Sequence, residues 1–228
     1  MSHRLVTVLV LFLGAFAFAR YQEQPEEPVT EQELLVRPAE LAGAPALSVD
    51  MAFMMAMDRS RTAGGAVILH GCDEPAKKVV RYRGNTLQEV LNDIVTADPS
   101  YRWEVENGVV NLLPAKGVPN LLNLQIASYD SGEAWSLATA GAYLLALPQV
   151  RKRATVMGFS QGITGSGLSG APPLGPPTPV RKLLGVRLQD VTLLEALNAL
   201  VRANRHGEWI YHETHCQLEN NFQVQFPE

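Results

Sequence analysis

The feature that most constrains the fold of this chain is an internal repeat. The sequence Thr86-Leu-Gln-Glu-Val-Leu-Asn-Asp-Ile-Val95 returns 106 residues later as Thr192-Leu-Leu-Glu-Ala-Leu-Asn-Ala-Leu-Val201. Without a gap, ten of the 24 positions from Val80 to Trp103 are identical to their counterparts. A repeat of this length indicates one supersecondary unit built twice. It constrains the architecture and says little about chemistry.

Each copy of the repeat predicts a capped helix followed by strands. Thr86 and Glu89 have the spacing of a capping box, and apolar residues recur after them at helical spacing. Asp98-Pro99 ends this helix, because the residue before a proline disfavours the helical conformation. Asn107-Gly108 then predicts a hairpin between two short apolar strands.

The same order of elements is expected in both halves of the chain. For the second half we predict strands at 121–126, 154–159, 184–188, 208–211 and 222–226, and helices at 131–147 and from Thr192. The predicted fold is therefore α+β, with two tandem β-α-β-β-α-β-β modules whose helices pack on one face of a mixed sheet. The predicted segments are modules at 46–115 and 120–228, with a Gly/Pro-rich loop at 161–179 in the second.

The first 19 residues have the pattern of a secretory signal peptide. His3-Arg4 precedes an apolar run from Leu5 to Phe18, and Ala17-Phe-Ala19 has the form of a cleavage site. The run is shorter than the ~20 residues of a membrane span, which favours cleavage over an uncleaved anchor. We expect an exported protein, periplasmic or secreted, with no membrane span after cleavage.

The next segment, residues 20–45, predicts an acidic, Pro-rich linker, because it offers few apolar groups to offset the entropy of ordering. A short helix is expected within it, near Thr30 to Val36. The whole chain has a net charge of -4 and a pI near 5.8. That balance gives no basic surface for nucleic acid.

Two cysteines in an exported chain raise the question of a disulfide. Cys72 and Cys216 would join the two halves, and two unpaired thiols are the alternative. The same regions hold histidines, and the resulting set of candidate metal ligands is His70, Cys72, His212, His215 and Cys216. Their spacing fits no known metal-binding finger, and a disulfide would use both thiols. We therefore expect neither a metal nor another cofactor.

Gly158-Phe-Ser-Gln-Gly162 matches the G-x-S-x-G pattern of a hydrolase nucleophile elbow, and an apolar strand is expected before it. In that alternative Ser160 is the nucleophile, Asp190 the acid, and His206, His212 or His215 the base. The elbow also needs a helix after the serine, and the Gly- and Pro-rich residues after Gly162 do not favour one. We therefore interpret the pattern as the entry to a loop, and predict that the protein is not an enzyme.

Aromatic side chains are the remaining candidates for a site. Trp103 and Trp209 occupy equivalent strand positions and are accompanied by Tyr101 and Tyr211. They could stack on a ligand, or they could be core residues that face the helices. The sequence alone leaves both interpretations open.

The pattern T-L-x-E-h-L-N, W-x-V and G-V-V-N-L-L-P resembles the secretin/TonB short N-terminal domain and related secretin N-modules. The resemblance covers residues 47–114 well and 121–226 more loosely. It implies small α+β domains on the periplasmic side of outer-membrane channels, which bind partner proteins and are not catalysts. The channel-forming β domain usual for that setting does not follow, so we expect an isolated module that binds a protein partner of the cell envelope. No oligomeric state follows from the sequence.

Overall fold

The computed structural model describes residues 29–39, 41, 45–71, 78–132, 134, 136–161, 185–205, 207–216 and 220–227. The predicted signal peptide, the start of the predicted linker and all of the predicted Gly/Pro-rich loop beyond Gln161 lie outside these residues. Within the described part of the chain, no helix combines the length and apolar character needed to cross a membrane.

The first half has the predicted order of elements, preceded by a short helix α1 (Glu31–Leu35). Its elements are β1 (Leu47–Ser48), α2 (Val49–Ser60), β2 (Gly64–Gly71), β3 (Val79–Val80), α3 (Leu87–Ala97), β4 (Tyr101–Glu106) and β5 (Val109–Pro114). The turn between β4 and β5 is Asn107-Gly108, with φ of 50° and 77°. Positive φ at both residues is the geometry of the two-residue hairpin turn that the sequence predicts.

The second half repeats this order with one additional helix. Its elements are β6 (Gln125–Asp130), α4 (Leu137–Leu145), α5 (Pro148–Val156), β7 (Ser160–Gln161), β8 (Arg187–Thr192), α6 (Leu193–Ala203), β9 (Glu208–His215) and β10 (Asn220–Gln225). The predicted α+β fold class is confirmed.

Two predicted strands of the second half differ from the structure, one in where it begins and one altogether. Residues 121–123 form a turn, and the strand begins only at Gln125. Residues 154–156 belong to α5, which begins at Pro148. The helix predicted at 131–147 would stop before Pro148, but proline also fits the first turn of a new helix, where its missing N–H is not needed.

The repeated helices begin as predicted. In α3 the Thr86 side chain accepts a hydrogen bond from the Glu89 backbone, and the Glu89 carboxylate accepts one from the Thr86 backbone. Thr192 and Glu195 make the same capping box at the start of α6. The repeated leucines Leu87, Leu91, Leu193 and Leu197 are all fully buried. The identities of the repeat are therefore explained by capping and packing.

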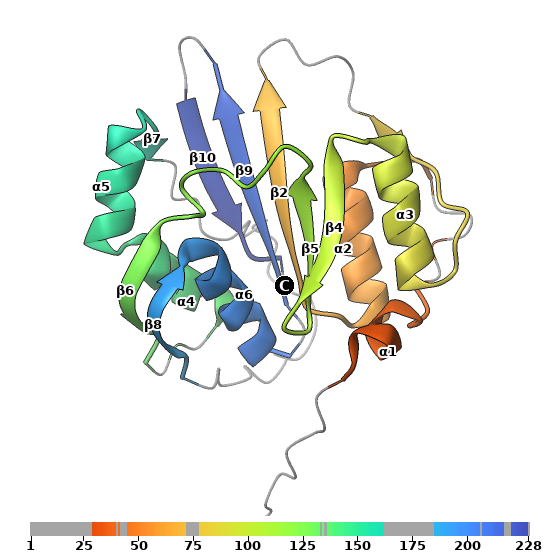
Figure 1. Ribbon diagram of the computed structural model, residues 1–228, viewed down its shortest axis with the longest axis horizontal. Helices are drawn as coiled ribbons and strands as arrows, with labels where there is room; N and C mark the ends of the chain where they lie inside the picture. The colour runs from red at the N-terminus through yellow and green to blue at the C-terminus, as the bar shows by residue number, and fades with distance from the viewer. Residues whose placement is uncertain are drawn as a thin grey trace, which may run out of the picture.

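The two halves share one six-stranded sheet in the order β4-β5-β2-β9-β10-β7. They join where β2 runs parallel to β9 over eight residue pairs, from Gly64 opposite Glu208 to Gly71 opposite His215. β2 is also parallel to β5, as β7 is to β10. Two small sheets, β1–β3 and β6–β8, lie outside this sheet. Figure 1 shows α2 and α3 on one side of the central strands and α4 and α6 on the other.

Alternate residues of β2 face two separate hydrophobic cores. Ala66 and Ile68 belong to the core under α2 and α3, and Val67 belongs to the core under α4 and α6. Within each module the helices thus cover one face of the sheet, as predicted. The helices of the two modules, however, cover opposite faces of the shared sheet. The predicted linker needs correction, because Leu35 and Leu41 are buried in the first of these cores.

Candidate functional site

The strand β4 is an open edge of the sheet, whereas its counterpart in the repeat is not. Within the described residues β4 pairs only with β5, and β9 pairs with both β10 and β2. The trio β4-β5-β2 corresponds to the trio β9-β10-β7. The edge of β9 that binds β2 is therefore the equivalent of the open edge of β4.

The backbone groups of alternate β4 residues point toward this open edge. Ala115 N donates a 2.7 Å hydrogen bond to Ser100 O. The backbone N–H and C=O groups of the even-numbered residues of β4 therefore point toward β5. Because adjacent residues of a strand point their backbone groups in opposite directions, Trp103 and Val105 present theirs to the open edge. The second half has the same pattern, since Gly64 N donates to Gly207 O over 3.1 Å at the join of β2 and β9.

The side chains of β4 differ between its two faces. Trp103 is partly buried against the first core and donates a 3.1 Å hydrogen bond from Nε1 to Asn92 Oδ1 of α3. On the opposite face Arg102 forms an exposed ion pair with Glu104. The edge therefore carries an indole under a helix on one face and two opposite charges on the other.

Of the four aromatic residues predicted as candidates, two are core residues. Trp209 and Tyr211 are fully buried. Trp103 and Tyr101 are only partly buried, and both lie on β4. Their exposure follows from the position of β4 at the edge of the sheet.

A cavity of about 230 Å³ lies at the carboxyl end of β2 and reaches the first residues of β4. It is lined by Ser48, Val49, Asp50, Ile68, Leu69, His70, Lys78, Asp98, Ser100 and Tyr101. β2 pairs with β9 over its whole length but with β5 only as far as Ala66. The cavity therefore borders the part of β2 that extends beyond β5.

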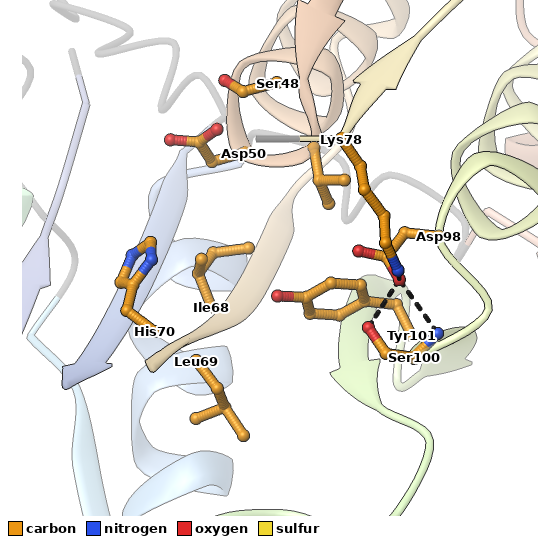
Figure 2. Close-up of a pocket in the computed structure, with 10 residues that line it drawn as sticks. Ser48, Asp50, Ile68, Leu69, His70, Lys78, Asp98, Ser100 and Tyr101 are labelled. Carbon is orange, nitrogen blue, oxygen red and sulfur yellow. Dashed lines mark hydrogen bonds and ion pairs between the residues drawn. The ribbon is translucent and has the colours of Figure 1, made fainter. Parts of the chain in front are cut away.

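An ion pair organises one wall of this cavity (Figure 2). Lys78 Nζ lies 2.6 Å from Asp98 Oδ1, and the Ser100 hydroxyl donates to the same oxygen over 2.6 Å. Burial by itself raises the pKa of Asp98, but the hydrogen bonds from Lys78 and Ser100 hold that pKa below its ordinary value. Asp98 is therefore ionised at neutral pH. No sequence motif pointed to this trio.

The candidate metal ligands are divided between the two faces of the sheet. His70 Nε2 lies 3.1 Å from His212 Nδ1, and their rings stack on the side of the first core. His215 lies on the other side, where its Nε2 is 2.5 Å from the buried Glu213. Glu213 also accepts a hydrogen bond from the Tyr211 hydroxyl. Within the described residues no three His, Cys, Asp or Glu side chains gather as a metal site.

The predicted disulfide concerns the carboxyl ends of β2 and β9. Cys216 is disulfide-bonded, whereas Cys72, the other cysteine of the chain, lies outside the described residues. The residues just before the two cysteines, Gly71 and His215, are partners in the parallel register. The pairing of Cys72 with Cys216 stays a prediction, which this register supports because neighbouring strands hold Cα atoms within disulfide range.

Of the residues of the hydrolase alternative, His212 and His215 lie in β9 of the same sheet as Ser160, whereas the proposed acid does not. Ser160 is in β7 and follows helix α5, so the strand that an elbow requires before the serine is absent. Asp190 lies in β8, which belongs to another sheet. His206 lies outside the described residues, as do residues 162–184.

Comparison of the chain with protein-family models, with curated proteins and with solved structures found no significant match.

The hydrogen bond between Trp103 and Asn92 was not predicted from the sequence. The signal was present, because both residues recur in the second copy at the same separation, as Asn198 and Trp209. Trp209 Nε1 donates to Asn198 Oδ1 over 2.9 Å. Two residues that are identical in both copies and keep the same separation in sequence can thus indicate a contact between them.

Proposed function

We propose that this protein is an exported, non-enzymatic binding module of the bacterial envelope that takes up an extended strand of a partner protein at the open edge of β4. One observation carries the proposal: the equivalent edge of β9 binds β2 along eight residue pairs. Strand addition uses the main-chain groups of an exposed edge for affinity and the neighbouring side chains for specificity.

The surroundings of β4 support this function. The backbone groups of Trp103 and Val105 face the edge, and open edges of this kind are templates for pairing with another chain. Export rests on the N-terminal sequence pattern, and the resemblance to secretin N-modules favours a protein partner.

The proposal is tested with a variant that blocks the edge without disturbing the hairpin. Val105→Pro removes a backbone N–H that faces the open edge and leaves the hydrogen bonds between β4 and β5 in place. Val105→Thr is the matched control, because it changes the side chain and keeps the N–H. Each protein is immobilised and exposed to an envelope extract, and its circular dichroism and melting temperature are measured in parallel.

We expect the wild type and Val105→Thr to retain the same partner, and a folded Val105→Pro to lose it. Retention by all three proteins would exclude the β4 edge. The competing hydrolase interpretation predicts ester turnover that disappears in Ser160→Ala. Such turnover would contradict the non-enzymatic assignment.

A further inference from the structure

The join between β9 and β2 has a steric requirement at one position. Gly65 is the register partner of Trp209. A Cβ atom placed on Gly65 would lie 2.1 Å from Trp209 Cε2, far inside any real contact distance. Trp209 therefore covers the backbone of the strand added beside it, and only glycine fits beneath its ring.

A hydrogen bond fixes the indole in the same way in both copies. Trp209 is tied to Asn198 of α6 over 2.9 Å, and Trp103 is tied to Asn92 of α3 over 3.1 Å. The donor, the acceptor and the separation in sequence are the same. The ring of Trp103 is therefore oriented to cover a strand beside β4, as Trp209 covers β2.

The two indoles differ in what covers them. Trp209 is fully buried, with β2 paired beside it. Trp103 is only partly buried, and no described strand pairs with the open edge of β4. The exposed part of Trp103 is thus a surface that an added strand would cover.

We infer that the segment bound by β4 runs parallel to it and carries glycine opposite Trp103. The inference rests on the proposed function and narrows the ligand to a glycine-containing extended segment of a partner protein. β2 itself, with the sequence Gly-Gly-Ala-Val-Ile-Leu-His-Gly from Gly64 to Gly71, is the example of such a segment within this chain. A bulkier residue opposite Trp103 is excluded by the same contact that excludes it at Gly65.

The test uses a fluorescent peptide with the sequence of residues 64–71, flanked by lysines for solubility, and full-length protein. A second peptide carries Gly65→Val. We expect the wild-type protein to bind the glycine peptide at least ~10-fold more tightly than the valine peptide, because overpacking a closed contact is unfavourable. The readout is fluorescence anisotropy.

Two protein variants test whether the indole of Trp103 causes the preference for the glycine peptide. Trp103→Ala removes the ring and should bring the two peptides within about twofold of each other. Asn92→Ala keeps the Trp103 ring but removes the hydrogen bond that orients it. It should therefore also reduce the preference for the glycine peptide over the valine peptide. This second variant also serves if Trp103→Ala does not fold. A peptide that displaces β2 from β9 would bind equally to all of these proteins, which would overturn the inference.

The possible failures are distinguishable. Equal binding of both peptides that is lost in Val105→Pro would overturn the glycine requirement and leave strand addition at β4 standing. If neither peptide binds while Val105→Pro still loses the envelope partner, the inference fails and the proposed function survives. If Val105→Pro also retains the partner, both fail.

Discussion

The two copies of the repeat have the same local structure and different surroundings. α3 and α6 begin with the same capping box, and an asparagine in each binds the tryptophan of the following strand. The strand β9 lies inside the sheet with a neighbour on each side, whereas β4 lies at its edge. As a result Trp209 is fully buried and Trp103 is not.

The residue before each tryptophan also differs in its exposure between the two copies. Glu208 in β9 is the counterpart of Arg102 in β4. Glu208 is buried, and its Oε2 has no hydrogen-bond partner among the residues that the structure describes. Arg102 is exposed and paired with Glu104. Local sequence thus sets the helix, the strand and the bond between them, and the adjacent strand sets the environment.

The largest difference is expected between the two tryptophans. Trp209→Ala should lower the free energy of unfolding by about 3–5 kcal/mol, because it leaves a cavity in the second core. Trp103→Ala should cost about 1–2 kcal/mol, because its ring is already partly in water. Urea denaturation of both variants measures these values. Equal losses would mean that the edge position does not decide the environment.

The second difference concerns charge. Burial, together with the Asp58 carboxylate, raises the pKa of Glu208 to about 8. Between the ordinary pKa near 4.5 and about 8 the unfolded chain releases a proton that the folded chain keeps, so the stability of the wild type falls as pH rises. Glu208→Gln should remove this slope and be more stable than the wild type by up to about 4 kcal/mol at pH 8, with no advantage near pH 4.

The control for this variant is its counterpart Arg102→Gln, because an arginine stays charged throughout the range. Thermal unfolding between pH 4 and pH 9 is the measurement. A stability difference between Glu208→Gln and the wild type that does not change with pH would contradict the assignment of the slope to Glu208.

A smaller difference is expected between the two asparagines. Asn198→Ala leaves the indole N–H of the fully buried Trp209 without its acceptor, which costs about 1–3 kcal/mol. Asn92→Ala should cost no more than ~0.5–1 kcal/mol, because water can reach the partly exposed Trp103. Chemical denaturation compares them. A loss for Asn92→Ala as large as that for Asn198→Ala would show that Trp103 is closed off from water.

The capping threonines should show no difference between the copies. Thr86→Ala and Thr192→Ala each remove a side-chain acceptor from a helix N-terminus and should cost about 1 kcal/mol. The change in melting temperature of the two variants should therefore be similar. Unequal losses would mean that the surrounding strands influence even the helix caps.

Local signals predicted a large part of the fold and a smaller part of the site. The capping boxes, the Asn107-Gly108 hairpin and the order of elements depend on contacts between residues close in sequence, and they were predicted. Residues 121–124 and 154–159 were wrongly predicted to be in strands, because a buried turn and a helix can carry the same apolar residues. The cavity residues Lys78, Asp98 and Ser100 carried no recognisable spacing.

About 24 residues of sequence are enough to specify the duplicated unit, its capped helix and the hydrogen bond between asparagine and tryptophan. Which copy has an open edge is not specified locally and follows from the packing of the whole chain. That choice depends on the pairing of Gly64–Gly71 with Glu208–His215, which brings together strands more than 100 residues apart. Backbone hydrogen bonds of this kind carry little side-chain information, so the same tryptophan becomes a core residue in one copy and part of the proposed binding edge in the other.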